Sequence, residues 1–110
     1  MASPADATAA ATFRALGDET RLALLTRLGA SGPLSVSQLA QGTAMTRQAV
    51  SKHLAVLARA GLARDSRHGR EHRWEADPAA VAEARRALDV LTARWEERLR
   101  KLKEMVEGKN

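Results

Sequence analysis

The spacing of apolar residues in the first third of the chain predicts two helices. After a loose terminus at residues 1–5, an alanine-rich run indicates a first helix over residues 6–17, with a glycine at its C-terminal end. Asp18 is a preferred residue for the N-cap of a second helix. The apolar stripe of this second helix consists of Leu22, Leu24, Leu25 and Leu28. We expect it to end at the helix-breaking residues Gly29, Gly32 and Pro33.

Residues 37–60 have the pattern of a helix-turn-helix. The segment before them, residues 34–36, is too short for more than a small edge strand. Ser35 and Gln38 have the spacing of a capping box, which predicts a short helix over residues 38–41. A glycine then supplies the turn, and a second helix follows. Two short helices around such a turn form this motif.

The second helix of the motif is predicted to begin at Thr46 and to end before Gly61. Met45 and Val50 occupy the two positions of a hydrophobic staple, which fixes the direction in which the chain enters the helix. One face of the helix is apolar and consists of Val50, Leu54 and Leu57. Because this face turns toward the core, the opposite face is available for binding.

Residues 62–76 predict a β-hairpin. Its strands cover residues 62–67 and 71–76 around His68-Gly69, and the glycine supplies the positive φ that a tight turn often needs. Alternation along the second strand places His72, Trp74 and Ala76 on one face, and Glu71, Arg73 and Glu75 on the other.

The last predicted element is a long helix over residues 78–107, with Pro78 at a position where its missing N–H costs nothing. Its apolar residues follow one another mostly at steps of 3 and 4, as in a coiled coil, and are Val81, Ala84, Leu88, Leu91, Trp95, Leu99, Leu102 and Val106. A helix of about 43 Å extends beyond the core of a small domain. We therefore expect its apolar seam to pack on a second chain; the alternative is that the helix folds back on its own domain.

Composition limits the class of protein. A chain of 110 residues allows one domain, residues 1–110, with a modest core that dimerisation would enlarge. The absence of cysteine excludes disulfides, thiolate metal sites and thiol redox sensing. One phenylalanine and two tryptophans are too few for the stacking platform of a single-strand binder. Without a membrane-length apolar run or a signal-peptide pattern, the expectation is a cytoplasmic protein that does not contact the membrane.

The formal net charge of +5 is confined to residues 46–74. This stretch has seven basic and two acidic residues, whereas residues 1–45 have three of each and residues 75–110 have eight of each. The basic block therefore falls on the second helix of the motif and on the hairpin. Such a block indicates a nucleic-acid binder, and the alternative is an ordinary solvated basic face.

The exposed face of the second helix has side chains suited to the major groove of DNA. Gln48, Ser51 and Lys52 are best placed for base edges, since glutamine pairs with adenine and lysine with guanine. Residues at the start and flank that suit phosphate contacts better are Thr46, Arg47 and His53. Arg59, further along, fits a phosphate contact or a plain solubilising charge.

The predicted tip of the hairpin adds Arg67, His68 and Arg70 to the candidate DNA-binding residues. Two arginines about a glycine turn can reach a narrow groove; the alternative is an exposed turn that is basic by chance. The order of elements, two helices, a helix-turn-helix, a basic hairpin and a long helix, is that of a winged helix-turn-helix. The predicted fold is thus mainly α with a small β-hairpin.

Several blocks of the sequence closely resemble the ArsR/SmtB family of regulators. These blocks are residues 13–21 (FRALGDETR), 34–40 (LSVSQLA), 49–57 (AVSKHLAVL), 60–62 (AGL), 69–70 (GR) and 77–78 (DP). The resemblance covers about residues 11–78, and it implies a bacterial or archaeal homodimeric repressor of palindromic operators. It also implies that the first and last helices form the dimer interface, for which we expect Phe13, Leu88, Leu91, Trp95, Leu99 and Leu102.

The metal sites known in that family lack their ligands here. Metal-sensing members have cysteines in the block that corresponds to residues 34–39, where this chain has serines and a valine. Others bind zinc with Asp, His and Glu on the last helix, which here has Asp89 and Glu96 but no histidine. The resemblance is therefore to the metal-free branch, with no metal and no cofactor. His68 and His72 could in principle coordinate across the hairpin; the alternative is a phosphate contact and a packed strand residue.

Catalytic residues are not predicted. The chain has no cysteine nucleophile, no glycine-rich phosphate loop and no histidine–carboxylate pair at motif spacing. The sequence thus predicts a homodimeric repressor of double-stranded operator DNA that is not an enzyme. A winged-helix protein-interaction module without DNA affinity is the rival class, although a protein-binding face would be more apolar. A third possibility is a regulator with an atypical metal or ligand site. The sequence specifies neither the operator nor a small-molecule effector.

Overall fold

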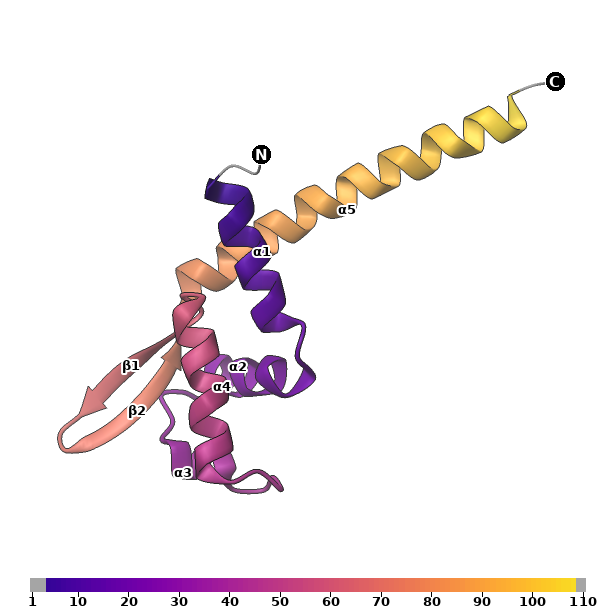
Figure 1. Cartoon of the computed structure of the whole chain (residues 1–110). Helices are drawn as coiled ribbons and strands as arrows, with labels where there is room; N and C mark the ends of the chain where they lie inside the picture. Colours follow the sequence, from indigo (N-terminus) through magenta and orange to yellow (C-terminus); the bar gives the residue numbers. More distant parts are fainter. Residues whose placement is uncertain (1–3, 109–110) are drawn as a thin grey trace.

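The computed structural model describes residues 4–108, in which a two-stranded antiparallel hairpin projects to one side of a group of helices (Figure 1). In chain order the elements are α1 (Pro4–Leu16), α2 (Glu19–Ser31), α3 (Val36–Ala40), α4 (Arg47–Arg59), β1 (Ala63–His68), β2 (Glu71–Ala76) and α5 (Pro78–Glu107). Helices α3 and α4 form the helix-turn-helix and the hairpin forms the wing. The fold is therefore the predicted winged helix-turn-helix, mainly α with a long C-terminal helix.

Side-chain caps fix where the helices begin. Asp18, Ser35, Thr46 and Asp77 are the N-caps of α2, α3, α4 and α5, and each accepts a backbone N–H of the first turn. The predicted capping box at Ser35 is complete, since its backbone N–H donates to Gln38 Oε1 at 2.8 Å. These caps satisfy donors that a helix leaves without partners, and so they set the breaks between elements.

The predicted helix boundaries need three corrections. Helix α1 begins at Pro4 rather than residue 6, and residues 1–3 of the expected loose terminus lie outside the described part. Helix α2 continues through Gly29 to Ser31, because a helical glycine costs only about 1 kcal/mol and the break comes at Gly32. Helix α3 begins at Val36, directly after its cap, rather than at residue 38.

The hairpin turn lies one residue later than predicted. His68 pairs with Glu71, so the two turn residues are Gly69 and Arg70 rather than His68 and Gly69. Gly69 has φ 66°, which places the positive φ at the first turn position, as in a type II′ turn. The predicted edge strand at residues 34–36 is reduced to one β-bridge between Leu34 and Trp74.

The core lies where α1, α2, α3 and α4 meet the base of the wing. Its fully buried side chains are Leu24, Leu39, Val50, Leu54, Leu57 and Leu62. Trp74 and Ala76 of β2 pack against this cluster from the edge. Because Val50, Leu54 and Leu57 all point inward from α4, the rotation of α4 about its own axis is fixed. The face that α4 presents to a binding partner is therefore fixed as well.

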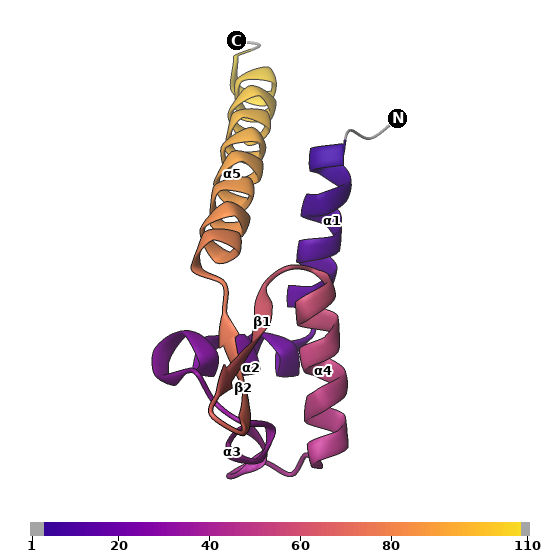
Figure 2. The ribbon, with the colours of Figure 1, turned by 90° about the vertical axis from the view of Figure 1, so that its left-hand side faces the viewer.

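Helix α5 extends away from this core, and the molecule measures 70 × 30 × 23 Å (Figure 2). Its first turns pack beside α1, with Ala80, Ala84 and Ala87 half-buried. Every residue from 88 to 108 is exposed. Within a single chain α5 therefore does not fold back over its own domain. No helix within residues 4–108 combines the length and apolar character needed to cross a membrane.

Candidate nucleic-acid interface

The outward face of α4 is polar, and its basic residues form no ion pair in the described part of the chain. Gln48, Ser51 and Lys52 are exposed, as are Thr46, Arg47 and Arg59 at the two ends of the helix. Opposite them, Val50, Leu54 and Leu57 have no exposed surface. Within residues 4–108 none of the basic residues on α4 contacts a carboxylate. The positive charge of this helix is thus available to an external anion.

The wing differs from α4, because two of its four arginines are already paired within the hairpin. Arg64 Nε lies 2.8 Å from Glu75 Oε1 and its Nη1 lies 3.7 Å from Asp77 Oδ2. Arg73 Nη2 lies 2.7 Å from Glu71 Oε2, and this hydrogen bond holds the pKa of Glu71 below its usual range. The charge count of the sequence therefore overstates what the wing can offer to DNA.

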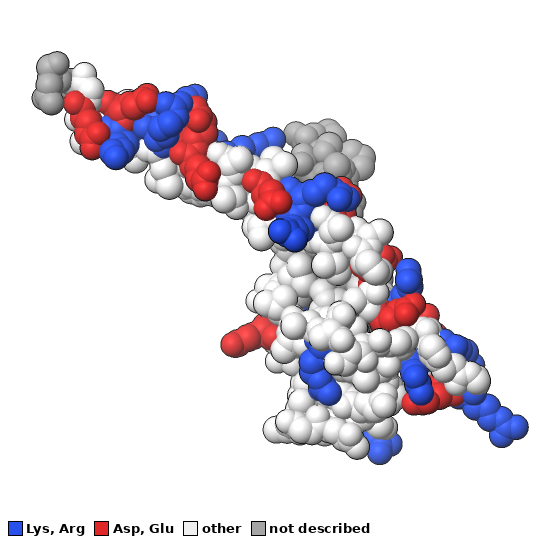
Figure 3. All heavy atoms as spheres, turned by 180° about the vertical axis from the view of Figure 1, so that it is seen from behind, with Lys and Arg blue, Asp and Glu red and all other residues white. Residues whose placement is uncertain are grey.

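Arg67 and Arg70 are the wing arginines without an ion pair in the described part of the chain. Both are exposed at the end of the hairpin, on either side of the glycine turn. Figure 3 shows basic side chains that project at this end of the molecule, whereas acidic and basic groups alternate along the far part of α5. The uncompensated charge of the wing is therefore concentrated at its tip.

The structure separates His68 and His72, which rules out a shared metal ion between them. In the strand register His72 is opposite Arg67 and His68 is opposite Glu71, so the two side chains leave opposite faces of the hairpin. His72 Nε2 lies 2.7 Å from Asp65 Oδ1, and its ring stacks on Trp74 at 5.4 Å. His68 Nε2 lies 3.0 Å from Ser66 Oγ. Coordination of one metal ion by both histidines across the hairpin does not fit this strand register.

His53 is less accessible than its neighbours on α4. It is half-buried and lies near the N-cap of α2. The pKa of the Asp18 carboxyl is lowered, first by the backbone N–H of Arg21 and further by the charges of Arg21 and His53. Sequence spacing gave no indication of this proximity, since it depends on how α4 packs against the start of α2.

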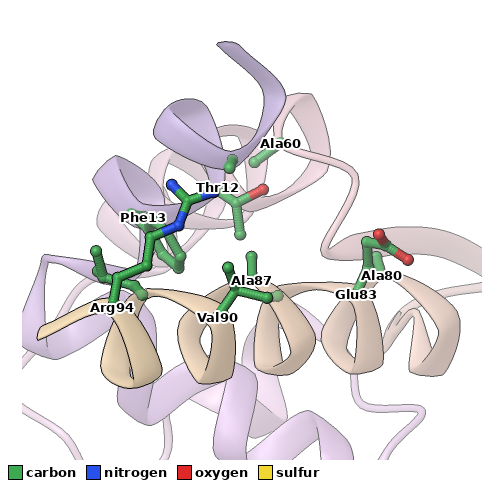
Figure 4. A pocket seen from close by; sticks show the side chains of 11 residues that line it. Thr12, Phe13, Ala60, Ala80, Glu83, Ala87, Val90 and Arg94 are labelled. Carbon is green, nitrogen blue, oxygen red and sulfur yellow. The ribbon is translucent and has the colours of Figure 1, made fainter. Parts of the chain in front are cut away.

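Helices α1 and α5, with Ala60 at the end of α4, line an open hollow of about 500 Å³ that the sequence did not predict (Figure 4). Its lining residues include Phe13 and Leu91, both expected at a dimer interface, together with Val90 and several alanines. Arg94 extends from α5 toward Thr12 and Phe13, while Glu83 at the other end is engaged by Arg86 at 2.5 Å. The hollow is thus an open, mainly apolar surface beside the seam of α5.

A cluster of three or more His, Cys, Asp or Glu side chains suitable for a metal ion does not occur in the described residues. The two acidic residues of α5 that the sequence raised, Asp89 and Glu96, are both exposed and lie on a helix without histidine. The structure therefore assembles no set of donors of the kind that zinc prefers.

Comparison with known proteins agrees with this arrangement. Residues 16–65 match a family model described as a helix-turn-helix domain. The chain is 43% identical over 77 residues to the HTH-type transcriptional regulator Rv2034 of Mycobacterium tuberculosis, and the alignment covers 70% of this chain and 71% of that protein. It is 32% identical over 77 residues to the arsenical resistance operon repressor of Escherichia coli, and the alignment covers 70% of this chain and 66% of that protein.

Two solved structures show the same arrangement of elements. An ArsR-like transcriptional regulator from Rhodococcus sp. RHA1 has 40% identity and a TM-score of 0.76, and the alignment covers 92% of this chain and 94% of that one. A homodimeric winged helix-turn-helix DNA-binding domain from Mycobacterium bovis has 25% identity and a TM-score of 0.65, with 84% and 91% covered. The protein is thus a transcriptional regulator with a winged helix-turn-helix DNA-binding domain. More specifically, the chain belongs to the ArsR family.

Proposed function

We propose that this regulator is a homodimeric repressor that binds a palindromic operator in double-stranded DNA. The observation that carries the proposal is the outward face of α4, where Gln48, Ser51 and Lys52 are exposed and, within residues 4–108, no carboxylate forms an ion pair with the arginines or the lysine of the helix. A helix of 13 residues with such a face fits the major groove.

Each candidate residue has a defined role in this proposal. Gln48, Ser51 and Lys52 read base edges near the start of α4, where the helix enters the groove. Thr46, Arg47 and His53 contact the phosphate backbone, which fixes the register of the helix without reading sequence. Arg67, His68 and Arg70 at the wing tip contact the adjacent backbone or minor groove. Eight of these nine residues are exposed, which is compatible with direct contact, and His53 is half-buried. The hydroxyl of Thr46 already accepts the backbone N–H of Ala49 as the cap of α4.

Dimerisation is proposed to occur through α1 and α5. The seam residues Leu88, Leu91, Trp95, Leu99 and Leu102 each leave 44–58% of their surface exposed in the single chain. A continuous apolar strip of this kind marks an interaction site. Phe13 and the hollow beside it extend the strip across α1. The M. bovis domain with the same fold is described as homodimeric, which supports assembly of this chain with a second copy.

Repression without a metal cofactor completes the proposal. The E. coli relative is named as an operon repressor, and a dimer seated on an operator blocks access to a promoter. The proposal includes no metal, because the described residues assemble no cluster of metal ligands. A chelator should therefore leave operator affinity unchanged, and a chelator-induced change in affinity would contradict this part of the proposal.

The proposed function can be tested by selection of binding sites from a random pool of double-stranded DNA. We expect enrichment of an inverted repeat, and reduced transcription in vitro from a promoter that contains it when the protein is added. A pool that shows no enrichment over repeated rounds would contradict sequence-specific DNA binding. Enrichment with increased transcription would contradict repression alone.

A further inference from the structure

Arg21, in the first turn of α2, reaches back to the end of α1. Its Nε donates to the carbonyl oxygen of Ala15 at 2.8 Å, and its Nη2 donates to that of Arg14 at 3.3 Å. These carbonyls belong to the last turn of α1, where a helix leaves its acceptors without partners. One guanidinium thus closes the end of α1 from the neighbouring helix.

Asp18 holds Arg21 in this position. Its Oδ1 accepts the backbone N–H of Arg21 at 3.0 Å as the N-cap of α2, and its Oδ2 lies 3.7 Å from Arg21 Nη1. His53 of α4 lies close enough to act on the charge of the same carboxylate. The pair Asp18–Arg21 therefore lies where α1, α2 and α4, the proposed recognition helix, meet.

A second arginine of α2 makes the same kind of contact at the end of α3. Arg27 Nη1 donates to the carbonyl oxygen of Leu39 at 2.7 Å, and its Nη2 donates to that of Gln38 at 3.1 Å. Both carbonyls lie in the last turn of α3. A single helix thus holds the ends of two others, one at each side, through half-buried guanidinium groups.

We propose that Arg21 and Arg27 are positioning residues that set the separation of the two recognition helices in the dimer. The inference rests on the proposed function, since it requires that α1 lies in the dimer interface and that α4 lies in DNA. Arg21 fixes α1 to α2, and Arg27 fixes α2 to the helix-turn-helix. Together they transmit the geometry of the interface to α4.

Arginine suits this role because its planar donors hold two carbonyl oxygens at once, whereas a lysine ammonium acts as a flexible point charge. A small change in the angle between α1 and α2 displaces α4, which lies below α1 with its N-terminal end farthest from it (Figure 2). Two half-sites are read together only if both helices meet successive grooves at the correct spacing. Loosening either contact should therefore relax the spacing that the dimer selects.

The test compares the wild type with Arg21→Lys and Arg27→Lys on a set of duplexes. The set contains the inverted repeat enriched from the random pool, versions with its half-sites one base pair closer or further apart, and a single half-site. Arg14→Lys is the matched control, because the Arg14 side chain is exposed and only its carbonyl takes part in the contact. Urea unfolding and sedimentation confirm that each variant is folded and dimeric.

For the wild type and Arg14→Lys we expect roughly tenfold or stronger preference for the selected spacing, because the second half-site binds as part of the same molecule. For Arg21→Lys and Arg27→Lys we expect this preference to shrink severalfold, with half-site affinity unchanged. Asp18→Asn, which keeps the N-cap but removes the charge that holds Arg21, should behave like Arg21→Lys. It replaces Arg21→Lys in the test if that variant does not fold.

Two results would overturn the proposal. One is an unchanged spacing preference in these variants, and the other is an equal loss of affinity on every duplex, the half-site included, which would reduce the arginines to a role in stability. Failure of the proposed function can be distinguished from these results by the wild-type measurement itself. In that case the wild type would bind the half-site and the full repeat with equal affinity.

Discussion

Leu34 and Trp74 exchange two backbone hydrogen bonds, with N–O distances of 2.9 Å for Leu34 to Trp74 and 2.8 Å for the reverse. This bridge joins the segment before α3 to the middle of β2, so the base of the wing is fixed to the helix-turn-helix. Trp74 also packs against the core. The wing tip therefore has a defined position relative to α4, and contacts at the tip should be coupled to those of the helix.

Substitution at the wing tip should alter the salt dependence of DNA binding. Arg67→Ala and Arg70→Ala should each weaken binding to all duplexes and reduce the slope of log affinity against log salt by about one, because each removes one phosphate contact. Arg64→Ala is the control, since Arg64 is held by Glu75 and Asp77. Its slope should match that of the wild type. Unchanged slopes for Arg67→Ala and Arg70→Ala would show that the wing does not contact phosphate.

Substitution on α4 should instead alter specificity. Gln48→Ala should cost about 1–3 kcal/mol on the enriched operator and little on random DNA, because a bidentate base contact discriminates by that amount. Fluorescence anisotropy titrations on both duplexes measure the difference. Arg59→Ala, at the far end of the same exposed face, should not change the ratio of the two affinities. Equal losses of affinity on both duplexes for Gln48→Ala would show that Gln48 does not contact base edges.

The stability of the fold should depend on the ionisation of Asp18. Its pKa is lowered from the ordinary 3.8, chiefly by the backbone N–H of Arg21. A lowered folded-state pKa contributes stability that is fully present above the unfolded-state value and lost as pH falls through the folded-state value. Asp18→Asn keeps a capping side chain without this titration.

The free energy of unfolding in urea, measured from pH 7 down to pH 3, should therefore differ between the wild type and Asp18→Asn. The advantage of the wild type should be constant at neutral pH and should shrink below about pH 4, near the reference pKa of Asp. A constant difference over the whole range would mean that the carboxylate charge does not stabilise the fold.

Substitution in the seam of α5 should separate the dimer. Leu99→Glu would bury a carboxylate in an apolar contact without a partner, at a cost of several kcal/mol in each subunit. We expect monomers in sedimentation and loss of operator binding. Lys101→Glu, a charge change on the same helix away from the seam, should remain dimeric. If Leu99→Glu remained dimeric and bound the operator as before, α5 would not be the element that holds the dimer together.

Much of the fold follows from local rules. The N-caps at Asp18, Ser35 and Thr46 are short polar residues directly before helical patterns, so the sequence contains their positions. The apolar residues of α4 that the sequence placed inside are fully buried. The hairpin turn was misplaced by one residue because a positive-φ glycine fits either position of a two-residue turn, and only the strand register distinguishes them.

Charge pairing and helix-end contacts could not be predicted in this way. The Arg64–Glu75 pair depends on the register that the turn determines, so the count of basic residues concealed that half of the wing arginines are neutralised. The contacts of Arg21 and Arg27 join residues on different helices through backbone carbonyls, which any sequence provides. Only the packing of α2 against its neighbours reveals them.

The central claim, that two copies of this chain read one operator through α4, is tested most directly by titration of the wild type on the enriched duplex and on a scrambled duplex at two salt concentrations. We predict two chains for each enriched duplex, weaker affinity for the scrambled one, and a decrease of both affinities as salt rises. Equal affinity for both duplexes, or no binding even at low salt, would contradict the claim and favour a winged-helix module that binds another protein.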